Sequence, residues 1–121
     1  YLFRSLDKMS LYAHYRAAGV GLVTPLRDGM NLVAQEYVAS RVEGDGALIL
    51  SEFAGAAEYL RGAITVNPYD IHAIADALDE VVEMPEKDIR RRMKTMRADV
   101  LKLDVHRWAD DYISVLEKGH P

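Results

Sequence analysis

The sequence predicts a single α/β domain in which a parallel sheet of about four strands carries helices on both faces. Two observations point that way. Short apolar runs alternate with longer segments whose apolar residues recur at helical spacing. Most of these runs are apolar at nearly every position, as expected for parallel strands that are covered on both faces. Such strand–helix alternation is typical of a parallel sheet with right-handed crossovers.

Composition and charge narrow the kinds of protein to consider. The chain has 121 residues, the size of one domain, and 50% of them are hydrophobic. A net charge of −4 argues against nucleic acid or an anionic membrane as the main partner, and no apolar run is long enough to span a membrane. The lack of cysteine excludes disulfides and thiolate zinc ligands, which suits the cytoplasm. We therefore expect no nucleic-acid partner, no membrane association, and no metal or other cofactor.

Four short apolar runs are the expected strands. They lie at residues 1–3, 20–24, 47–50 and 63–67. Helical periodicity separates them over residues 7–18 and 31–41, whereas residues 51–62 are predicted to form a loop with one or two helical turns. Because the chain starts with Tyr1 inside the first of these runs, we expect it to be a fragment of a longer protein.

After Asn67 and Pro68 the chain is predicted to be helical to its end. One helix begins at Asp70, a residue type that caps helices, and the next begins at Pro85. Their apolar stripes consist of Ile71, Ile74, Ala75, Leu78 and Val82, and of Ile89, Met93, Met96, Val100 and Leu103. A third helix starts near Asp104 and aligns Val105, Trp108, Ala109, Tyr112, Ile113 and Leu116. Each stripe is interpreted as a face that packs into a core.

The loop that follows the expected strand 20–24 is the best candidate for a binding site. Ligands of open parallel α/β sheets bind beyond the carboxyl ends of the strands. Gly29 permits backbone angles or a close approach that a side chain would forbid. Asn31 can cap the next helix, and the free N–H groups of that helix's first turn attract phosphate. Arg27 adds a positive charge to the same loop.

Glu36 is the second unusual residue of this region. It follows Leu32 by four residues and Val33 by three, so the spacing puts it on the helix side that is expected to pack inward. A buried carboxylate needs hydrogen-bond donors, and the adjacent hydroxyls of a ribose would be suitable ones. Two other interpretations stay open, namely a solvated residue at the edge of the stripe and a partner of a lysine or arginine elsewhere.

Two acids therefore flank the predicted phosphate-attracting helix start. Asp28 precedes Glu36 by eight residues, an order that suits the sugar, diphosphate and ribose of a nucleotide sugar, although this spacing alone is a weak motif.

The other polar residues give weaker evidence of a functional site. The four histidines lack metal-ligand spacing, and the basic residues 90–94 are interpreted as a solvated face. The segment 51–55 points to the same rim as the glycine loop.

Longer stretches of sequence carry a family resemblance. The segments "LVTPLRDGMNLVAQEYVASR", "LILSEFAGAAEYL", "ITVNPYD" and "DVHRWADDYISVL" resemble the C-terminal part of trehalose-6-phosphate synthases. The similarity covers almost the whole chain. It implies a retaining glycosyltransferase of the GT-B fold, in which two Rossmann-like domains face a cleft. Residues 1–121 would form part of the C-terminal domain, with a final helix over 104–121 that crosses to an N-terminal domain.

The resemblance also implies roles for individual residues. Asp28 would bind glucose hydroxyls of UDP-glucose, and Glu36 would take the ribose hydroxyls. The backbone that meets glucose and diphosphate would belong to Gly29, Met30, Asn31, Leu32 and Val33. The acceptor, glucose 6-phosphate, would bind mainly to the other domain, and the basic catalytic pair would lie upstream. We therefore expect no catalytic residue within these 121 residues, an inactive fragment, no cofactor, and an enzyme compatible with a homo-oligomer.

Two positions depart from the family's usual pattern. Gly19 stands where an aspartate is usual, and Gln35 stands where a lysine is usual. Neither removes a residue assigned to the site, and Gln35 is expected to affect solvation more than ligand binding. Two alternatives therefore remain: a relative such as glucosylglycerol-phosphate synthase, and a catalytically silent module that binds a nucleotide or a partner protein.

Overall fold

The computed structural model describes residues 4–103, 109–110 and 113–114, and within them it contains one parallel sheet. Its strands are β1 (Val20–Val23), β2 (Ala47–Ser51) and β3 (Ile64–Val66), in the order β1-β2-β3. Val20 pairs with Ala47 and Ile49 pairs with Ile64, both in parallel. The predicted parallel pairing is confirmed for three strands. The fourth expected strand, at residues 1–3, lies outside the described residues.

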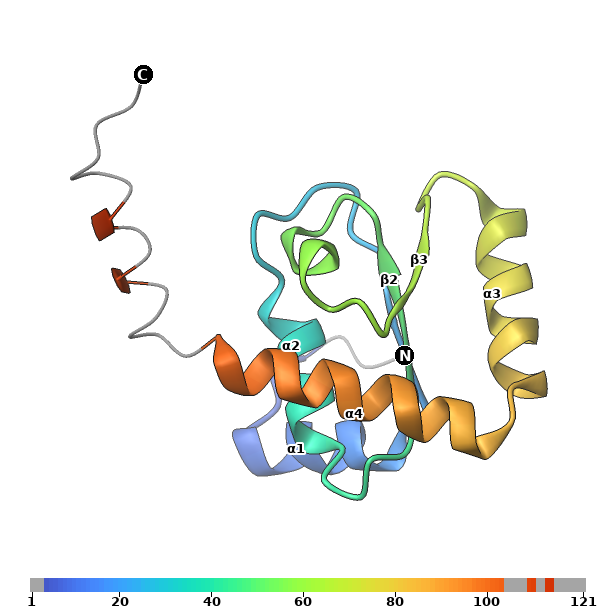
Figure 1. Cartoon of the computed structure of the whole chain (residues 1–121), viewed down its shortest axis with the longest axis horizontal. Helices are drawn as coiled ribbons and strands as arrows, with labels where there is room; N and C mark the ends of the chain where they lie inside the picture. Colours follow the sequence, from blue (N-terminus) through green and yellow to red (C-terminus); the bar gives the residue numbers. More distant parts are fainter. Residues whose placement is uncertain (1–3, 104–108, 111–112, 115–121) are drawn as a thin grey trace.

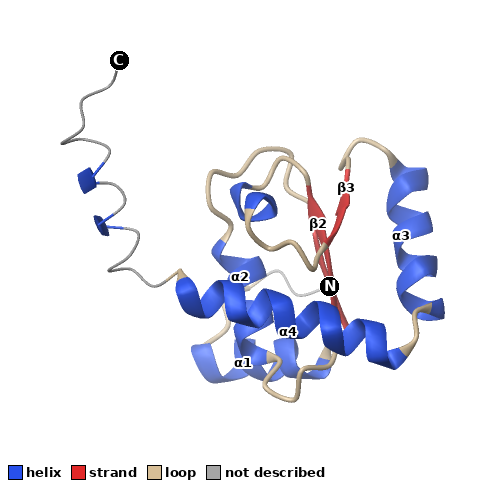
Figure 2. Cartoon of the chain, in the orientation of Figure 1, coloured by secondary structure: helices blue, strands red, loops and turns tan. Residues whose placement is uncertain are grey.

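Helices cover both faces of this sheet, as predicted (Figure 1, Figure 2). The helices are α1 (Lys8–Ala17), α2 (Leu32–Ser40), α3 (Ile71–Glu83) and α4 (Glu86–Lys102), with a short 3-10 helix η1 (Gly55–Glu58). Helices α2 and α4 pack on one face, whereas α3 stands on the other. No helix in the described part of the chain is long and apolar enough to cross a membrane.

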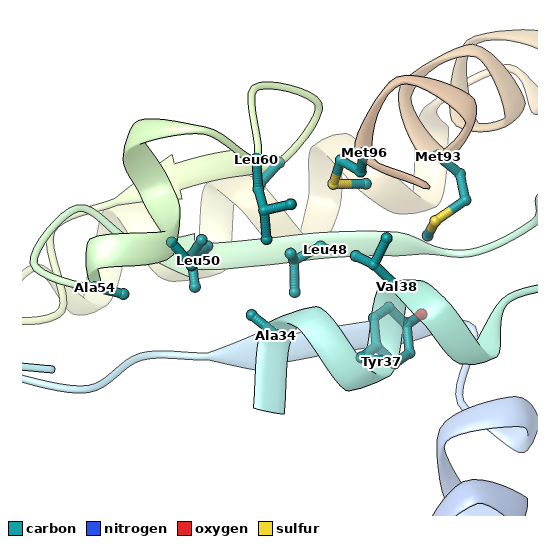
Figure 3. Close-up of a cluster of buried hydrophobic side chains, with 11 residues drawn as sticks. Ala34, Tyr37, Val38, Leu48, Leu50, Ala54, Leu60, Met93 and Met96 are labelled. Carbon is teal, nitrogen blue, oxygen red and sulfur yellow. The ribbon is translucent and has the colours of Figure 1, made fainter. Parts of the chain in front are cut away.

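Strand β2 is the centre of the core because all five of its residues are buried. Leu48 and Leu50 point to the larger cluster, and Figure 3 shows them between α2, η1 and α4. The side chains of that cluster include Ala34, Tyr37, Val38, Leu60, Met93 and Met96. Ile49 alternates to the opposite face, where the smaller cluster joins β2 and β3 to α3. The near-continuous apolar sequence of β2 is thus explained by the burial of both of its faces, as predicted.

The inward face of α3 differs from the predicted stripe. Asp70 caps the helix as expected, and its carboxylate accepts from the backbone N–H of Ala73 at 3.0 Å. The residues that pack against the sheet are Ala77 and Val81, with Ile74 partly buried. Ile71, Ala75, Leu78 and Val82 are exposed instead. The apolar residues of α3 form one broad side, and only one edge of it meets β2 and β3, so spacing alone did not identify the packed residues.

Helix α4 follows its prediction more closely. Met93 and Met96 are fully buried, and Val100 packs against the same cluster. Helix α1 is different, because it contains no buried residue and Met9 and Tyr12 of its predicted apolar side are exposed. The predicted third helix, including Trp108 and Tyr112, lies almost entirely outside the described residues, so its expected exposure is not tested.

Candidate functional site

Two loops lie side by side at the carboxyl end of the sheet. The backbone N–H of Asp28 donates to the carbonyl of Phe53 at 3.3 Å, and the N–H of Gly55 donates to the carbonyl of Asp28 at 2.8 Å. This short parallel bridge joins the loop after β1 to the loop after β2. The prediction that segment 51–55 shares a rim with the glycine loop is therefore confirmed.

Asp28 shapes the loop after β1. Its carboxylate accepts from the backbone N–H groups of Met30 at 3.1 Å and Asn31 at 3.0 Å, and from the side-chain amide of Asn31 at 2.9 Å. The hydrogen bond from the Met30 backbone is the main reason why the pKa of Asp28 lies below its ordinary value. A carboxylate has about four lone-pair positions, so one remains for a ligand hydroxyl.

Asn31 links this loop to α2. Its side-chain oxygen accepts from the N–H of Ala34 at 2.8 Å, which confirms the predicted N-cap. The residue is buried and has a φ of 61°, a left-handed conformation that asparagine tolerates better than most side chains. By helix geometry, the N–H groups of the first turn lack intrahelical acceptors, so the start of α2 suits an anion.

Gly29 shows neither the special backbone angles nor the close approach that the sequence suggested for it. Its φ is not positive, and a Cβ atom built there would meet nothing within 4 Å. The close approach occurs at Gly55 instead, where a Cβ would lie 2.1 Å from the carbonyl oxygen of Gly29. Gly55 therefore lets the two loops touch, while the backbone at Gly29 stays open to a ligand.

Helix α2 faces the core with other residues than predicted. Ala34, Tyr37 and Val38 are buried, whereas Leu32 and Val33 are 57% and 46% exposed. The expectation that Leu32 and Val33 pack inward was wrong, because this nine-residue helix is apolar on more than one side. With Met30, which is also exposed, these two residues leave an apolar surface beside the start of α2.

The side chain of Glu36 is half-buried and faces α1. By helix geometry it lies on the side of α2 away from the core residues Ala34 and Val38. Its Oε2 atom accepts a hydrogen bond from the hydroxyl of Tyr15 at 3.3 Å. Among the described residues no lysine or arginine forms an ion pair with it. The donor on the protein side is thus a tyrosine, which the sequence reasoning missed because the pair is 21 residues apart.

The two unusual positions are accommodated differently. Gln35 donates from Nε2 to the hydroxyl of Tyr59 at 2.7 Å and so ties α2 to the residue after η1. A Cβ at Gly19 would meet nothing within 4 Å, so no close packing requires glycine there. Arg27 is exposed in the loop after β1.

Arg41 is a buried charge that the sequence reasoning did not identify. Its guanidinium pairs with Asp45 at 2.8 Å and donates to the backbone carbonyls of Tyr15 at 3.1 Å and Ala18 at 3.0 Å, as well as to that of Arg16. These bonds attach the C-terminal end of α1 to the end of α2. The only sign of this role in the sequence was an arginine at the end of an otherwise apolar helix.

The other polar candidates behave as surface residues. Arg90 pairs with Glu86 and Arg91 pairs with Asp88 on exposed turns of α4, consistent with a solvated face. In the part of the chain that the structure describes, no three histidine or acidic side chains are grouped to hold a metal ion.

The fold and the position of this rim define a Rossmann-like α/β domain with a loop-and-helix site beyond its first described strand. Residues 1–118 match the sequence model of glycosyltransferase family 20. The chain belongs to that family.

Known proteins match this chain over 94% to 100% of its length. A protein of Mycobacterium tuberculosis strain H37Rv named trehalose-6-phosphate synthase is 50% identical over 121 residues, which are 100% of this chain and 24% of that protein. An E. coli structure described as bound with UDP-2-fluoro glucose has 44% identity and a TM-score of 0.89 over 100% of this chain and 27% of its own. A Burkholderia xenovorans trehalose-phosphate synthase in complex with glucose-6-phosphate has 43% identity and a TM-score of 0.88, covering 94% and 26%. The chain thus spans about a quarter of the length of these relatives.

Proposed function

We propose that this chain holds the sugar donor of a retaining glycosyltransferase that moves glucose from UDP-glucose to glucose 6-phosphate, giving trehalose 6-phosphate. The support comes from the family and from the names of relatives that share its whole length. The observation that carries the proposal is the hydrogen-bonded unit of Asp28 and the capped start of α2, with Glu36 further along the same helix. Along the chain these groups follow the order of sugar, diphosphate and ribose in a nucleotide sugar.

In the proposal, each part of the donor has a partner in this loop and helix. The first-turn N–H groups of α2 that Asn31 does not cap would receive the diphosphate, with the backbone from Gly29 to Val33 along it. The open lone pair of Asp28 would accept from a glucose hydroxyl. Glu36 would accept from the ribose, and the exposed side chains of Met30, Leu32 and Val33 would cover apolar parts of the donor.

The chemical contribution of this chain would be positional and electrostatic. As the bond between glucose and the diphosphate breaks, negative charge grows on the diphosphate, and the oriented N–H groups at the start of α2 stabilise it. In the proposal, the acceptor and the basic catalytic pair belong to parts of the enzyme beyond these residues. Residues 104–121 are proposed to form a helix that crosses to the acceptor domain.

The decisive variant is Glu36→Gln in the protein at its full natural length. It keeps the shape of the side chain but removes the charge, and charge-assisted hydrogen bonds contribute roughly 1.5–3 kcal/mol each. We expect UDP binding, measured by calorimetric titration, to weaken about tenfold to a hundredfold. The control is Glu80→Gln, an exposed acid on α3 at the opposite face of the sheet, which should bind UDP like the parent. Unchanged UDP affinity in Glu36→Gln would remove Glu36 from the site.

Asp28→Asn tests the sugar end of the site. We expect it to reduce the preference for UDP-glucose over UDP, because Asp28 is assigned to glucose. The structure adds a second effect. The new amide would point an N–H₂ group at the amide of Asn31, which already uses its oxygen to cap α2. A variant that also loses thermal stability therefore agrees with the proposal, whereas an unchanged preference for the sugar contradicts it.

Turnover separates an enzyme from a silent binding module. With UDP-glucose and glucose 6-phosphate, the full-length protein should release UDP and form trehalose 6-phosphate. Binding of UDP without turnover on any sugar-phosphate acceptor would instead favour the silent module. Turnover with glycerol 3-phosphate but not with glucose 6-phosphate would favour a glucosylglycerol-phosphate synthase.

A further inference from the structure

Tyr15 is the one described side chain that donates a hydrogen bond to Glu36. It lies on α1, and its hydroxyl is 3.3 Å from Oε2 of Glu36. The Tyr15 ring packs edge-on against the ring of Tyr37, with 6.4 Å between the centroids and 89° between the planes. Burial, and then the negative charge of Glu36, raise the pKa of Tyr15. The phenol therefore stays protonated, and remains a donor, at neutral pH.

The position of Tyr15 is fixed from the far end of α2. Helix α1 has no buried residue of its own, so packing alone holds it weakly. The buried guanidinium of Arg41 donates to the carbonyl of Tyr15 at 3.1 Å and to that of Ala18 at 3.0 Å. Asp45 pairs with the same guanidinium at 2.8 Å. Arg41 thereby fixes the backbone of α1 at the residue whose hydroxyl reaches Glu36.

We propose that Tyr15 is a positioning residue for nucleotide recognition, which holds one oxygen of Glu36 so that the remaining lone pairs face the cis-diol of a ribose. This inference rests on the proposed function, because it assumes that Glu36 binds the ribose. A glutamate side chain has several rotatable bonds, and ordering it on binding reduces affinity. A tyrosine that orders the carboxylate beforehand favours ligands that carry both hydroxyls, that is, ribonucleoside diphosphates over 2′-deoxy forms.

The test compares UDP with 2′-deoxy-UDP by calorimetric titration of the full-length protein. Tyr15→Phe removes the hydroxyl and keeps the ring against Tyr37. We expect the ratio of the two affinities to fall about threefold to tenfold, the effect of one hydrogen bond. Tyr12→Phe is the matched control, because Tyr12 lies one turn earlier on α1 and is 40% exposed. Its ratio should equal that of the parent.

Glu36→Gln separates the failure of this inference from the failure of the proposed function. If Glu36→Gln lowers the ratio and Tyr15→Phe does not, Tyr15 has no positioning role, and the assignment of Glu36 stands. If neither variant lowers the ratio, Glu36 does not bind the ribose and both ideas fall. A partly unfolded Tyr15→Phe sample lowers the apparent affinity for both nucleotides alike, so the ratio still decides.

Discussion

The side chains of Asp28 and Asn31 connect the loop after β1 to helix α2 through two hydrogen bonds. The Asp28 carboxylate accepts from the Asn31 amide nitrogen at 2.9 Å, while the amide oxygen accepts from the N–H of Ala34 at 2.8 Å. Because both ends of one amide are used, the loop after β1 and the start of α2 are held as a unit. A residue proposed to contact the sugar thus also fixes the helix start proposed to bind the diphosphate.

Replacing Asn31 should reveal two separate contributions to stability. Asn31→Ala loses the cap, about 1 kcal/mol, and must adopt a left-handed backbone at a further cost of roughly 1–2 kcal/mol. Asn31→Gly adopts that backbone freely and should lower the free energy of unfolding by about 1 kcal/mol or less. Asp70→Ala at the start of α3, which loses only a cap, is the control at about 1 kcal/mol. Chemical denaturation measures all three, and equal losses for Ala and Gly at position 31 would contradict the account.

Alanine should lower the stability of the protein at Gly55 but not at Gly29. At Gly55 the new methyl would lie 2.1 Å from the carbonyl oxygen of Gly29, so the two loops must separate. Gly55→Ala should therefore destabilise the protein by about 1–3 kcal/mol. Gly29→Ala meets open space and should leave thermal stability nearly unchanged while weakening UDP-glucose, whose diphosphate is proposed to pass there. Thermal unfolding and calorimetric titration check the pair, and a stable Gly55→Ala protein would disprove the contact.

The sequence was sufficient for the parts of the fold that depend on local pattern. The runs that became β1, β2 and β3 are apolar at nearly every position, so their parallel pairing was predictable, as was the complete burial of β2. The expected cover on both faces is incomplete at β1, where Leu22 is 47% exposed. The caps at Asn31 and Asp70 were predictable for the same local reason. It was harder to predict which face of each helix packs inward. In α3, Val82 is 77% exposed and Val81 is buried, although both are valine.

The sequence predicted part of the local structure around the candidate site, but few of its contacts. Asp28, Gly29, Asn31 and Glu36 do lie along one loop and helix. The donor to Glu36 was not foreseeable, because it depends on how α1 is placed against α2. That placement depends on Arg41, whose bonds go to backbone carbonyls, and a backbone carbonyl has no sequence signature.

Removing Arg41 should be far more damaging than removing an exposed arginine. Arg41→Met keeps much of the volume but leaves the carbonyls of Tyr15 and Arg16 and the carboxylate of Asp45 without this donor. The carbonyl of Ala18 loses one of its two donors and keeps the hydroxyl of Tyr37. A buried group without its partner costs several kcal/mol, so we expect a loss of about 2–4 kcal/mol. Arg16→Met removes an exposed ion pair with Glu43 and should cost about 1 kcal/mol or less. Denaturant titration compares them, and similar losses would show that Arg41 does not hold α1.

High pH should destabilise the protein through one buried and two partly buried tyrosines. Burial raises the pKa values of Tyr15, Tyr37 and Tyr59 above the ordinary value of 10.0. The folded state then holds these phenol protons more tightly than the unfolded state does. Their contribution to stability is therefore fully present below pH 10 and is lost as the pH rises through the folded values.

Tyr37 should dominate this alkaline loss, because it is the most deeply buried of the three and its hydroxyl donates to the carbonyl of Ala18 at 3.0 Å. Ionisation would turn that donor into an anion facing a carbonyl oxygen. Unfolding measured at several pH values should show stability falling above pH 10. Tyr37→Phe should make the fall shallower, whereas Tyr12→Phe should not, since Tyr12 is exposed. A Tyr37→Phe protein with the parent's pH dependence would mean that the buried phenol does not control alkaline stability.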